Sequence, residues 1–246
     1  FNTQTGVLSG TPTELWPQTT YMVWANNSGG SSTAYLNITV VDQLPTIAYS
    51  ASNLLLTNNT PSTDLPLVPT LTGAGEITSW AINASLPAGL TFETSNGTIW
   101  GTPTELWNTT AYVVWANNSG GSSEAYLNIT VIDQLPTSLT YTPENVTMVR
   151  DEASTDLPLV PTLTGPGEIT SWAINGSLPS GLSFGTTNGT IWGVPLVNMT
   201  TTTYTVWANN TGGSLSTTIN VTVLEPAVML DYNPENMTLI RGVHMV

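Results

Sequence analysis

Cysteine and lysine are absent from this sequence, and histidine occurs once, as His244. Without cysteine, neither a disulfide nor a thiolate metal site can form, and without lysine a Lys–Asn isopeptide cross-link is excluded. A single histidine rules out His-based catalytic triads and multi-histidine metal sites, so His244 is interpreted as incidental. The pattern also places no two acidic residues together in a cleft. The sequence therefore predicts a protein that is stabilised by packing and is not an enzyme.

Charge is scarce and almost all of one sign. Only 7% of the 246 residues are charged, Arg150 and Arg241 are the only basic residues apart from the histidine, and the formal net charge is −14. Binding to nucleic acid or to anionic lipid needs Lys and Arg, so neither is expected as a partner. No apolar run reaches 18 residues, and we expect no membrane insertion in this segment. An apolar content of 40% is enough for a folded core.

Internal repetition dominates what is present. Residues 89–121 return nearly unchanged at 181–213, and a third copy occupies 1–30. A period near 90 residues is too long for one turn of a solenoid and fits a whole small β domain in tandem.

Four segments follow from this repeat. We predict the second half of a repeat at 1–45, complete repeats at 46–136 and 137–226, and the first strand or strands of a further repeat at 227–246. The junctions are short and contain proline, which favours semi-rigid joints over flexible tethers.

Within 46–136 the turn residues and the alternation of apolar side chains indicate about seven short strands, and no stretch has a helical period. Asn96-Gly97 lies between apolar residues and predicts a type I′ hairpin turn. The fold class is therefore all-β, with tandem immunoglobulin-like β-sandwich domains of about 90 residues and about seven strands each. The strands are expected near 53–57, 65–69, 76–83, 90–92, 98–100, 111–117 and 124–132.

Alternation along these strands also assigns the tryptophans to faces. Trp80 and Trp172 align with apolar neighbours and are expected in the core. A second group is expected to point outward, where it could contact neighbouring domains, other chains or sugar rings. The alternative, that these residues also belong to the core, stays open. The outward candidates are Trp24, Trp100, Trp115, Trp192 and Trp207.

Asn-x-Ser/Thr sequons are unusually dense, with fifteen in the chain and none with proline in the middle position. They recur at matching positions of successive repeats, which favours their use as acceptors of N-linked glycans. We therefore expect an extracellular or cell-surface protein whose solubility comes from glycans and not from charge. The sequons begin at Asn26, Asn37, Asn58, Asn83, Asn96, Asn108, Asn117, Asn128, Asn145, Asn175, Asn188, Asn198, Asn209, Asn220 and Asn236.

The order Leu-Pro-x-Gly-Leu, Gly-x-Ile-x-Gly-x-Pro and a Tyr/Val strand resembles the immunoglobulin-like, cadherin-related repeat of large prokaryotic surface proteins. The resemblance implies a β-sandwich with a spacer or adhesive role and no catalytic residues. Sequon density and the lack of lysine suggest an archaeal source. The matching residues are Leu86, Pro87, Gly89, Leu90, Gly97, Ile99, Gly101, Pro103 and Tyr112, repeated at Leu178, Pro179, Gly181, Leu182, Gly189, Ile191, Gly193, Pro195 and Tyr204.

Cadherin-like junctions often bind calcium through clustered carboxylates, and Asp42 and Asp133 lie at the junctions here. Each junction offers one carboxylate where several are needed. We treat both residues as weak calcium candidates and expect no cofactor apart from glycans.

The favoured function is structural: an extracellular, heavily N-glycosylated fibre, filament or cell-surface stalk. Its partners would be copies of itself or further repeats of the same chain. The alternative is a carbohydrate- or cell-binding adhesin module that uses the outward tryptophans. Either residues 1–246 are a window on a longer array, which is preferred, or the C-terminal strand of one subunit completes the N-terminal half-domain of the next.

Overall fold

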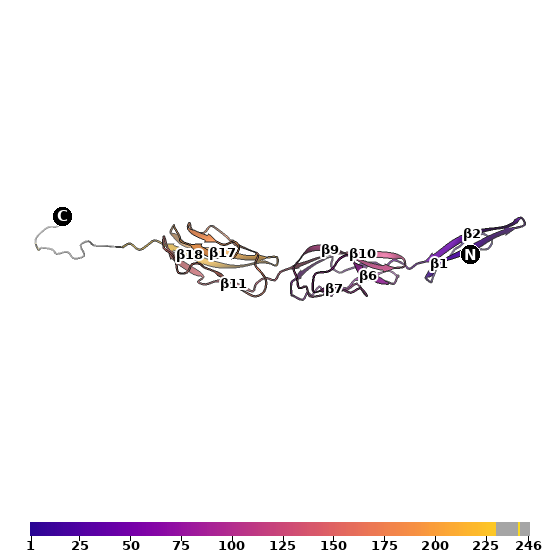
Figure 1. Ribbon diagram of the computed structural model, residues 1–246, viewed down its shortest axis with the longest axis horizontal. Coiled ribbons are helices and arrows are strands. Elements are labelled where there is room, and N and C mark those ends of the chain that lie inside the picture. The colour runs from indigo at the N-terminus through magenta and orange to yellow at the C-terminus, as the bar shows by residue number, and fades with distance from the viewer. Residues whose placement is uncertain (230–240, 242–246) are drawn as a thin grey trace. The chain divides into compact units, whose positions relative to one another are not determined.

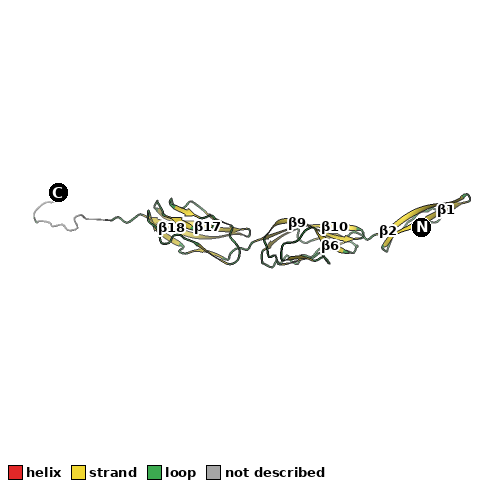
Figure 2. Cartoon of the chain, viewed as in Figure 1, coloured by secondary structure: helices red, strands yellow, loops and turns green. Residues whose placement is uncertain are grey.

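The computed structural model describes residues 1–229 and 241, and its described part consists of strands and loops (Figure 2). Those residues contain no helix, and thus none with the length and hydropathy needed to cross a membrane. This confirms the all-β prediction. The chain divides into two compact units, Phe1–Ile132 and Asp133–Val246. Of the further repeat expected at 227–246, residues 230–240 and 242–246 lie outside the described residues.

The N-terminal part is a single antiparallel hairpin of β1 (Trp16–Asn27) and β2 (Gly30–Val40), labelled in Figure 1. The first complete domain follows as a four-stranded sheet, in the order β4-β10-β9-β6, facing the two-stranded sheets β3-β5 and β7-β8. Its strands are β3 (Thr46–Ala48), β4 (Asn53–Thr57), β5 (Thr70–Thr72), β6 (Ser79–Ile82), β7 (Leu90–Phe92), β8 (Ile99–Gly101), β9 (Trp107–Asn118) and β10 (Gly121–Ile132).

The second complete domain repeats this build strand for strand, with the four-stranded order β12-β18-β17-β14 and the pairs β11-β13 and β15-β16. In each domain the first strand of the large sheet joins its neighbour in parallel, and the other pairs in the sheet are antiparallel. The strands are β11 (Ser138–Tyr141), β12 (Asn145–Val149), β13 (Pro161–Thr164), β14 (Ser171–Ile174), β15 (Leu182–Phe184), β16 (Ile191–Gly193), β17 (Met199–Asn210) and β18 (Gly213–Leu224).

Proline and side-chain hydrogen bonding explain where the strand predictions were wrong. The strand expected at 65–69 is reduced to one bridge between Leu67 and Ile99, because Pro66 and Pro69 have no N–H to donate to a ladder. Strand β5 begins directly after Pro69 and pairs with the short strand β3, which was not predicted. Strands β7 and β8 do form a hairpin, but in its turn only Gly97 has positive φ, at 75°. The Asn96 side chain instead accepts a hydrogen bond from the Thr98 N–H, at 3.0 Å.

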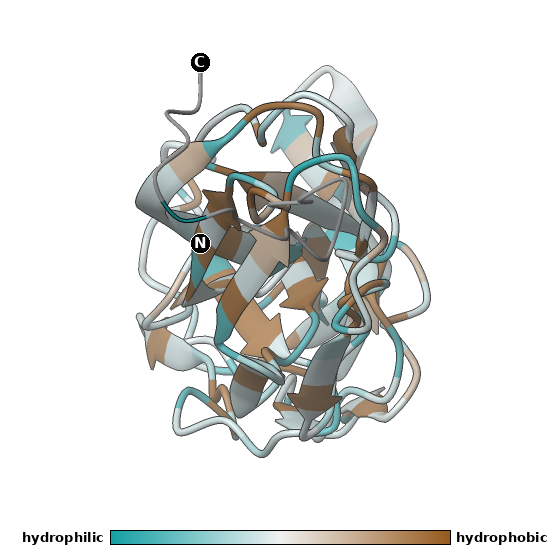
Figure 3. Ribbon diagram, turned by 90° about the vertical axis from the view of Figure 1, so that its left-hand side faces the viewer, coloured by the Kyte–Doolittle hydropathy of each residue, from teal (hydrophilic) through white to brown (hydrophobic). Residues whose placement is uncertain are grey.

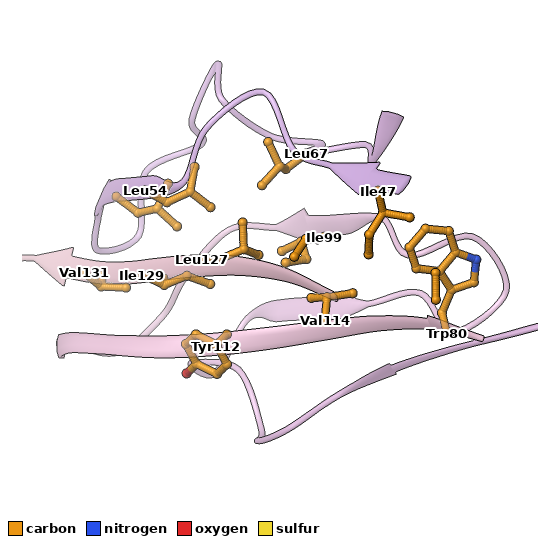
Figure 4. Close-up of a cluster of buried hydrophobic side chains, with 13 residues drawn as sticks. Ile47, Leu54, Leu67, Trp80, Ile99, Tyr112, Val114, Leu127, Ile129 and Val131 are labelled. Carbon is orange, nitrogen blue, oxygen red and sulfur yellow. The ribbon is translucent and has the colours of Figure 1, made fainter. Parts of the chain in front are cut away.

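The core of each domain lies between the large sheet and the smaller pairs, as Figure 4 shows for the first domain. Trp80 closes one end of this core with 7% of its surface exposed, and Trp172 is 6% exposed in the second domain, which confirms both as core residues. Along the long strands apolar and polar side chains alternate, as the banding in Figure 3 illustrates. Tyr112, Val114 and Ala116 of β9 are fully buried by this alternation.

Tyrosine hydroxyls link the two smaller strand pairs of each domain at matching places. Tyr141 donates a hydrogen bond to the Gly189 carbonyl at 2.6 Å, and Tyr49 donates one to the Gly97 carbonyl at 2.5 Å. Burial raises the pKa of both phenols well above the ordinary value for tyrosine. The folded protein therefore holds these protons more tightly than the unfolded chain does.

This difference predicts a loss of stability in alkali. An unfolded tyrosine releases its proton near its ordinary pKa of about 10, whereas the folded one keeps it, so the stabilisation is complete below about pH 10 and falls as pH rises beyond it. Urea unfolding between pH 8 and 11 should show this fall, reduced in Tyr141→Phe. A Tyr35→Phe control, on the exposed surface of the hairpin, should leave the unfolding midpoint unchanged. An equal fall in the Tyr141→Phe protein would contradict the assignment.

Candidate functional site: the outer sheet face and the junctions

The five outward tryptophan candidates separate into two groups. Trp24, Trp100 and Trp192 are 57%, 48% and 45% exposed. Trp115 and Trp207 are half-buried, because each lies on an inner strand of a four-stranded sheet with side chains on both sides. None of the five belongs to the buried core.

A carboxylate joins two aromatic rings on the outer face of the first domain. Trp115 Nε1 donates to Glu124 Oε1 at 3.0 Å, and the Tyr126 hydroxyl donates to Glu124 Oε2 at 2.5 Å. The pKa of Glu124 is lowered mainly by the hydrogen bond from Tyr126 and, to a smaller extent, by that from Trp115. The hydrogen bond between Tyr126 and Glu124 also raises the pKa of Tyr126. We call these three residues the aromatic–acid cluster. Sequence analysis missed Glu124 and Tyr126, although the antiparallel register of a tight hairpin would have placed them beside Trp115.

The other repeats do not reproduce this cluster. In the second domain Trp207 lies opposite Ser216, and in the N-terminal hairpin Trp24 lies opposite Thr33. In the hairpin Tyr35 takes the place of Tyr126 and is 73% exposed. Thr33 takes the place of Glu124, so no carboxylate links Tyr35 to Trp24.

The sequon asparagines lie at or near the surface throughout the described residues. None of the fourteen described is fully buried, and Asn236 lies outside the described residues. Nine are exposed: Asn26, Asn37, Asn83, Asn96, Asn108, Asn145, Asn175, Asn188 and Asn198. Five are half-buried: Asn58, Asn117, Asn128, Asn209 and Asn220.

Each junction aspartate is bound to backbone groups of the domain that follows it. The Asp133 carboxylate accepts hydrogen bonds from the N–H groups of Gln134, at 2.8 Å, and Glu168, at 2.9 Å. Its own N–H donates to the Thr211 hydroxyl at 2.8 Å. Asp42 repeats this pattern with Gln43, Glu76 and Ser119 in the first domain.

The amide side chain of Asn210 completes the second junction by donating to the Gln134 carbonyl at 2.6 Å, as Asn118 does to Gln43. Gly167 leaves room for the linker at Gln134, since a Cβ there would come within 1.9 Å of the Gln134 carbonyl oxygen. Among residues 1–229 and 241, no three acidic or histidine side chains gather in a way that could hold a metal ion. The junction aspartates therefore act as caps for the following domain.

The inner face of the N-terminal hairpin is open. Tyr21 and Leu36 are 40% and 39% exposed, whereas their counterparts in the repeat, Tyr112 and Leu127, are buried. Tyr21 and Leu36 line an apolar hollow of about 520 Å³ together with Phe1, Leu8, Met22, Val23, Trp24 and Ile38.

Both complete domains match a known protein family. The family described as "Putative Ig domain" matches residues 45–132 and 135–224, which include both sandwiches. The chain belongs to this family. Two tandem Ig repeats are therefore present, and the matched ranges lie within a few residues of the segments 46–136 and 137–226.

Curated relatives of these Ig repeats are bacterial. The "Serine-rich adhesin for platelets" of Staphylococcus aureus strain MRSA252 is 32% identical over 158 residues, which cover 62% of this chain and 11% of the adhesin. The same protein of strain MSSA476 is also 32% identical, over 6% of its length. The chain thus spans a small fraction of these relatives. The archaeal source suggested by the sequons finds no support in them.

Among solved structures, the likeness extends over most of the chain at low identity. Extracellular domains 3–5 of Drosophila OTK align with a TM-score of 0.43 and 14% identity, covering 84% of this chain and 71% of that one. A variant of titin domains I67–I69 aligns with a TM-score of 0.39 and 15% identity, covering 85% and 75%.

Proposed function

We propose that this chain is part of an extracellular, N-glycosylated stalk or fibre built from tandem Ig domains, with a structural and spacing role. The observation that carries the proposal is the repeated junction. Each linker is held on the next domain by the same set of hydrogen bonds, from Asp42 and Asn118 in one case and from Asp133 and Asn210 in the other. Such a capped linker holds the start of each domain in place, which suits a spacer that carries load.

Glycans fit this role because the surface has few charges. With only two Lys or Arg residues in the chain, the polar cover of the sheets is Ser, Thr and Asn, and accessible sequons lie in the hairpin and in both complete domains. N-linked glycans at these positions would supply the hydration that charged side chains usually provide, and would shield exposed strand edges from pairing with other chains.

The partners that suit the open hairpin are strands of the same repeat. In the complete domains β12 pairs in parallel with β18, from Asn145 opposite Asn220 onward. The sequence PENMTLI at 234–240 matches PENVTMV at 143–149, which contains β12. We propose that a strand of this type, from a further repeat of the same chain or from a neighbouring copy, pairs in parallel with β2 at the edge of the hairpin.

An adhesin module is the second candidate. It is supported by the exposed rings of Trp24, Trp100 and Trp192 and by relatives whose name describes an adhesin for platelets. Large aromatic faces are suited to packing against sugar rings or another protein surface. Because the chain spans so little of those relatives, their partners are not transferred to it.

Electron cryomicroscopy of the native material, with density followed beyond residues 1 and 246, tests the structural role. We expect strings of Ig domains outside the cell, with glycan density at the sequons. Density continuing into further repeats identifies a long array, and a strand inserted from a neighbour identifies a polymer of short subunits. Isolated, unglycosylated particles would contradict the proposal.

Tryptophan variants separate the two candidates. If the rings of Trp100 and Trp192 bind an external partner, replacing both with alanine should leave the fibres intact. The same substitutions should abolish binding of the protein to that glycan or cell. Loss of fibre integrity with unchanged retention favours the structural role.

A further inference from the structure

The outer face of the first domain places aromatic rings beside sequon asparagines on the same strands. Side chains two residues apart on a strand share a face and lie about 6.6 Å apart. On β9 this relates Trp115 to Asn117, and on β10 it relates Tyr126 to Asn128. The register puts Trp115 opposite Glu124 and Tyr126 opposite Val113, so the two rings are diagonal neighbours. The rings therefore lie between the two sequon asparagines on this face.

The aromatic–acid cluster orients its rings by their polar edges. Both oxygens of Glu124 accept a hydrogen bond, one from the Trp115 indole and one from the Tyr126 hydroxyl, which restrains the two side chains. Tyr126 is still 65% exposed and Trp115 is half-buried, so apolar ring surface remains accessible. Restrained aromatic surface at low entropy cost is well suited to packing against the C–H face of a pyranose ring.

The side-chain amides of the two sequon asparagines are compatible with attachment of a glycan. Asn117 Nδ2 donates to Ser79 Oγ at 3.3 Å, and Asn128 Nδ2 donates to Asn53 Oδ1 at 2.8 Å. A primary amide nitrogen carries two hydrogens, and a glycan replaces one of them. Each asparagine can thus keep its present hydrogen bond after modification.

We propose that the aromatic–acid cluster is a carbohydrate-contact site for the N-linked glycans on Asn117 and Asn128, packing against their first pyranose rings. The inference rests on the proposed glycosylation of this face. Because such a sugar is tethered beside the rings, its effective concentration there far exceeds that of a free saccharide. The cluster therefore supports the protein's own glycans and is unavailable to an external sugar while they are attached.

The second domain provides an internal comparison. It carries the same two sequons on the same face, at Asn209 and Asn220, and the same tryptophan at Trp207. Ser216 and Thr218 replace the carboxylate and the second ring. Glycans on this domain would have only one unrestrained ring to pack against.

Protection of glycans from an endoglycosidase tests the site. The full chain is made in a secretory host that attaches uniform high-mannose glycans, and the folded protein is digested with an endoglycosidase that cuts within the glycan core. Glycopeptide mass spectrometry then follows the fraction of uncut glycan at Asn117 and Asn209 in the same sample. Packing worth about 0.5–1.5 kcal/mol corresponds to cleavage about 2- to 13-fold slower at Asn117.

Two substitutions give the controls. Trp115→Ala should raise the cleavage rate at Asn117 to at least that at Asn209 and leave Asn209 unchanged. Trp207→Ala should leave Asn117 unchanged. Equal rates at the two sites in the unsubstituted protein, or no response to Trp115→Ala, would overturn the contact site while leaving glycosylation intact. If mass spectrometry finds Asn117 and Asn128 unoccupied, the contact site is refuted and the proposed glycosylated surface is refuted on this face as well.

Discussion

Replacement of Trp172 by alanine is expected to lower the free energy of unfolding of the second domain by about 3–5 kcal/mol. The indole is 6% exposed and packs within the core of that domain. A domain of this size has a total stability of about 5–15 kcal/mol, so the loss should be a large fraction of the total. Urea unfolding followed by hydrogen exchange, read on peptides from each domain, would locate the loss in the second domain.

Trp192→Ala is the matched control for this effect. It removes the same side chain from the same domain, but at a position that is 45% exposed, and surface substitutions usually change stability by about 0.5 kcal/mol or less. Trp80→Ala and Trp100→Ala offer the same comparison in the first domain, with exposures of 7% and 48%. Equal losses for the inner and outer tryptophans would contradict the assignment of faces.

Gly97→Ala is expected to cost about 2–5 kcal/mol, because it combines backbone strain with overpacking. Gly97 has φ of 75°, and an added Cβ would lie 2.4 Å from the ring of Trp80. Gly189 repeats both features against Trp172, at φ of 69° and 2.5 Å. Gly6, the corresponding residue of the first repeat, has φ of 71° with nothing within 4 Å of the added atom. Gly6→Ala should therefore leave the melting of the complete domains unchanged.

A double-mutant cycle separates the two contributions at Gly97. In a Trp80→Leu background the side chain facing the new methyl group is smaller, and the cost of Gly97→Ala should fall towards that of backbone strain alone, about 1–2 kcal/mol. Thermal and urea unfolding of the four proteins would give the coupling energy. An unchanged cost in the Trp80→Leu background would show that contact with the indole is not the reason for glycine here.

Much of the fold could be predicted from local patterns because the domains are repeats of short strands. Alternation with a period of two is set by the pleat, so it placed Trp80 and Trp172 in the core before any contact was known. The same alternation correctly kept Trp100 and Trp192 out of it. Alternation could not predict the exposed fraction of each outward side chain. Whether Trp115 is exposed or half-buried depends on which strands flank β9.

The sequence by itself determined the fold class, the repeat and the inward and outward faces, since these depend on composition and on residues close together in the chain. Only the tertiary structure decided how residues distant in sequence pair. It made Asp42 and Asp133 caps for the domains that follow them, by bringing the N–H groups of Glu76 and Glu168 to their carboxylates. The reason is that such hydrogen bonds depend on where loops more than 30 residues apart come together, which no local pattern encodes.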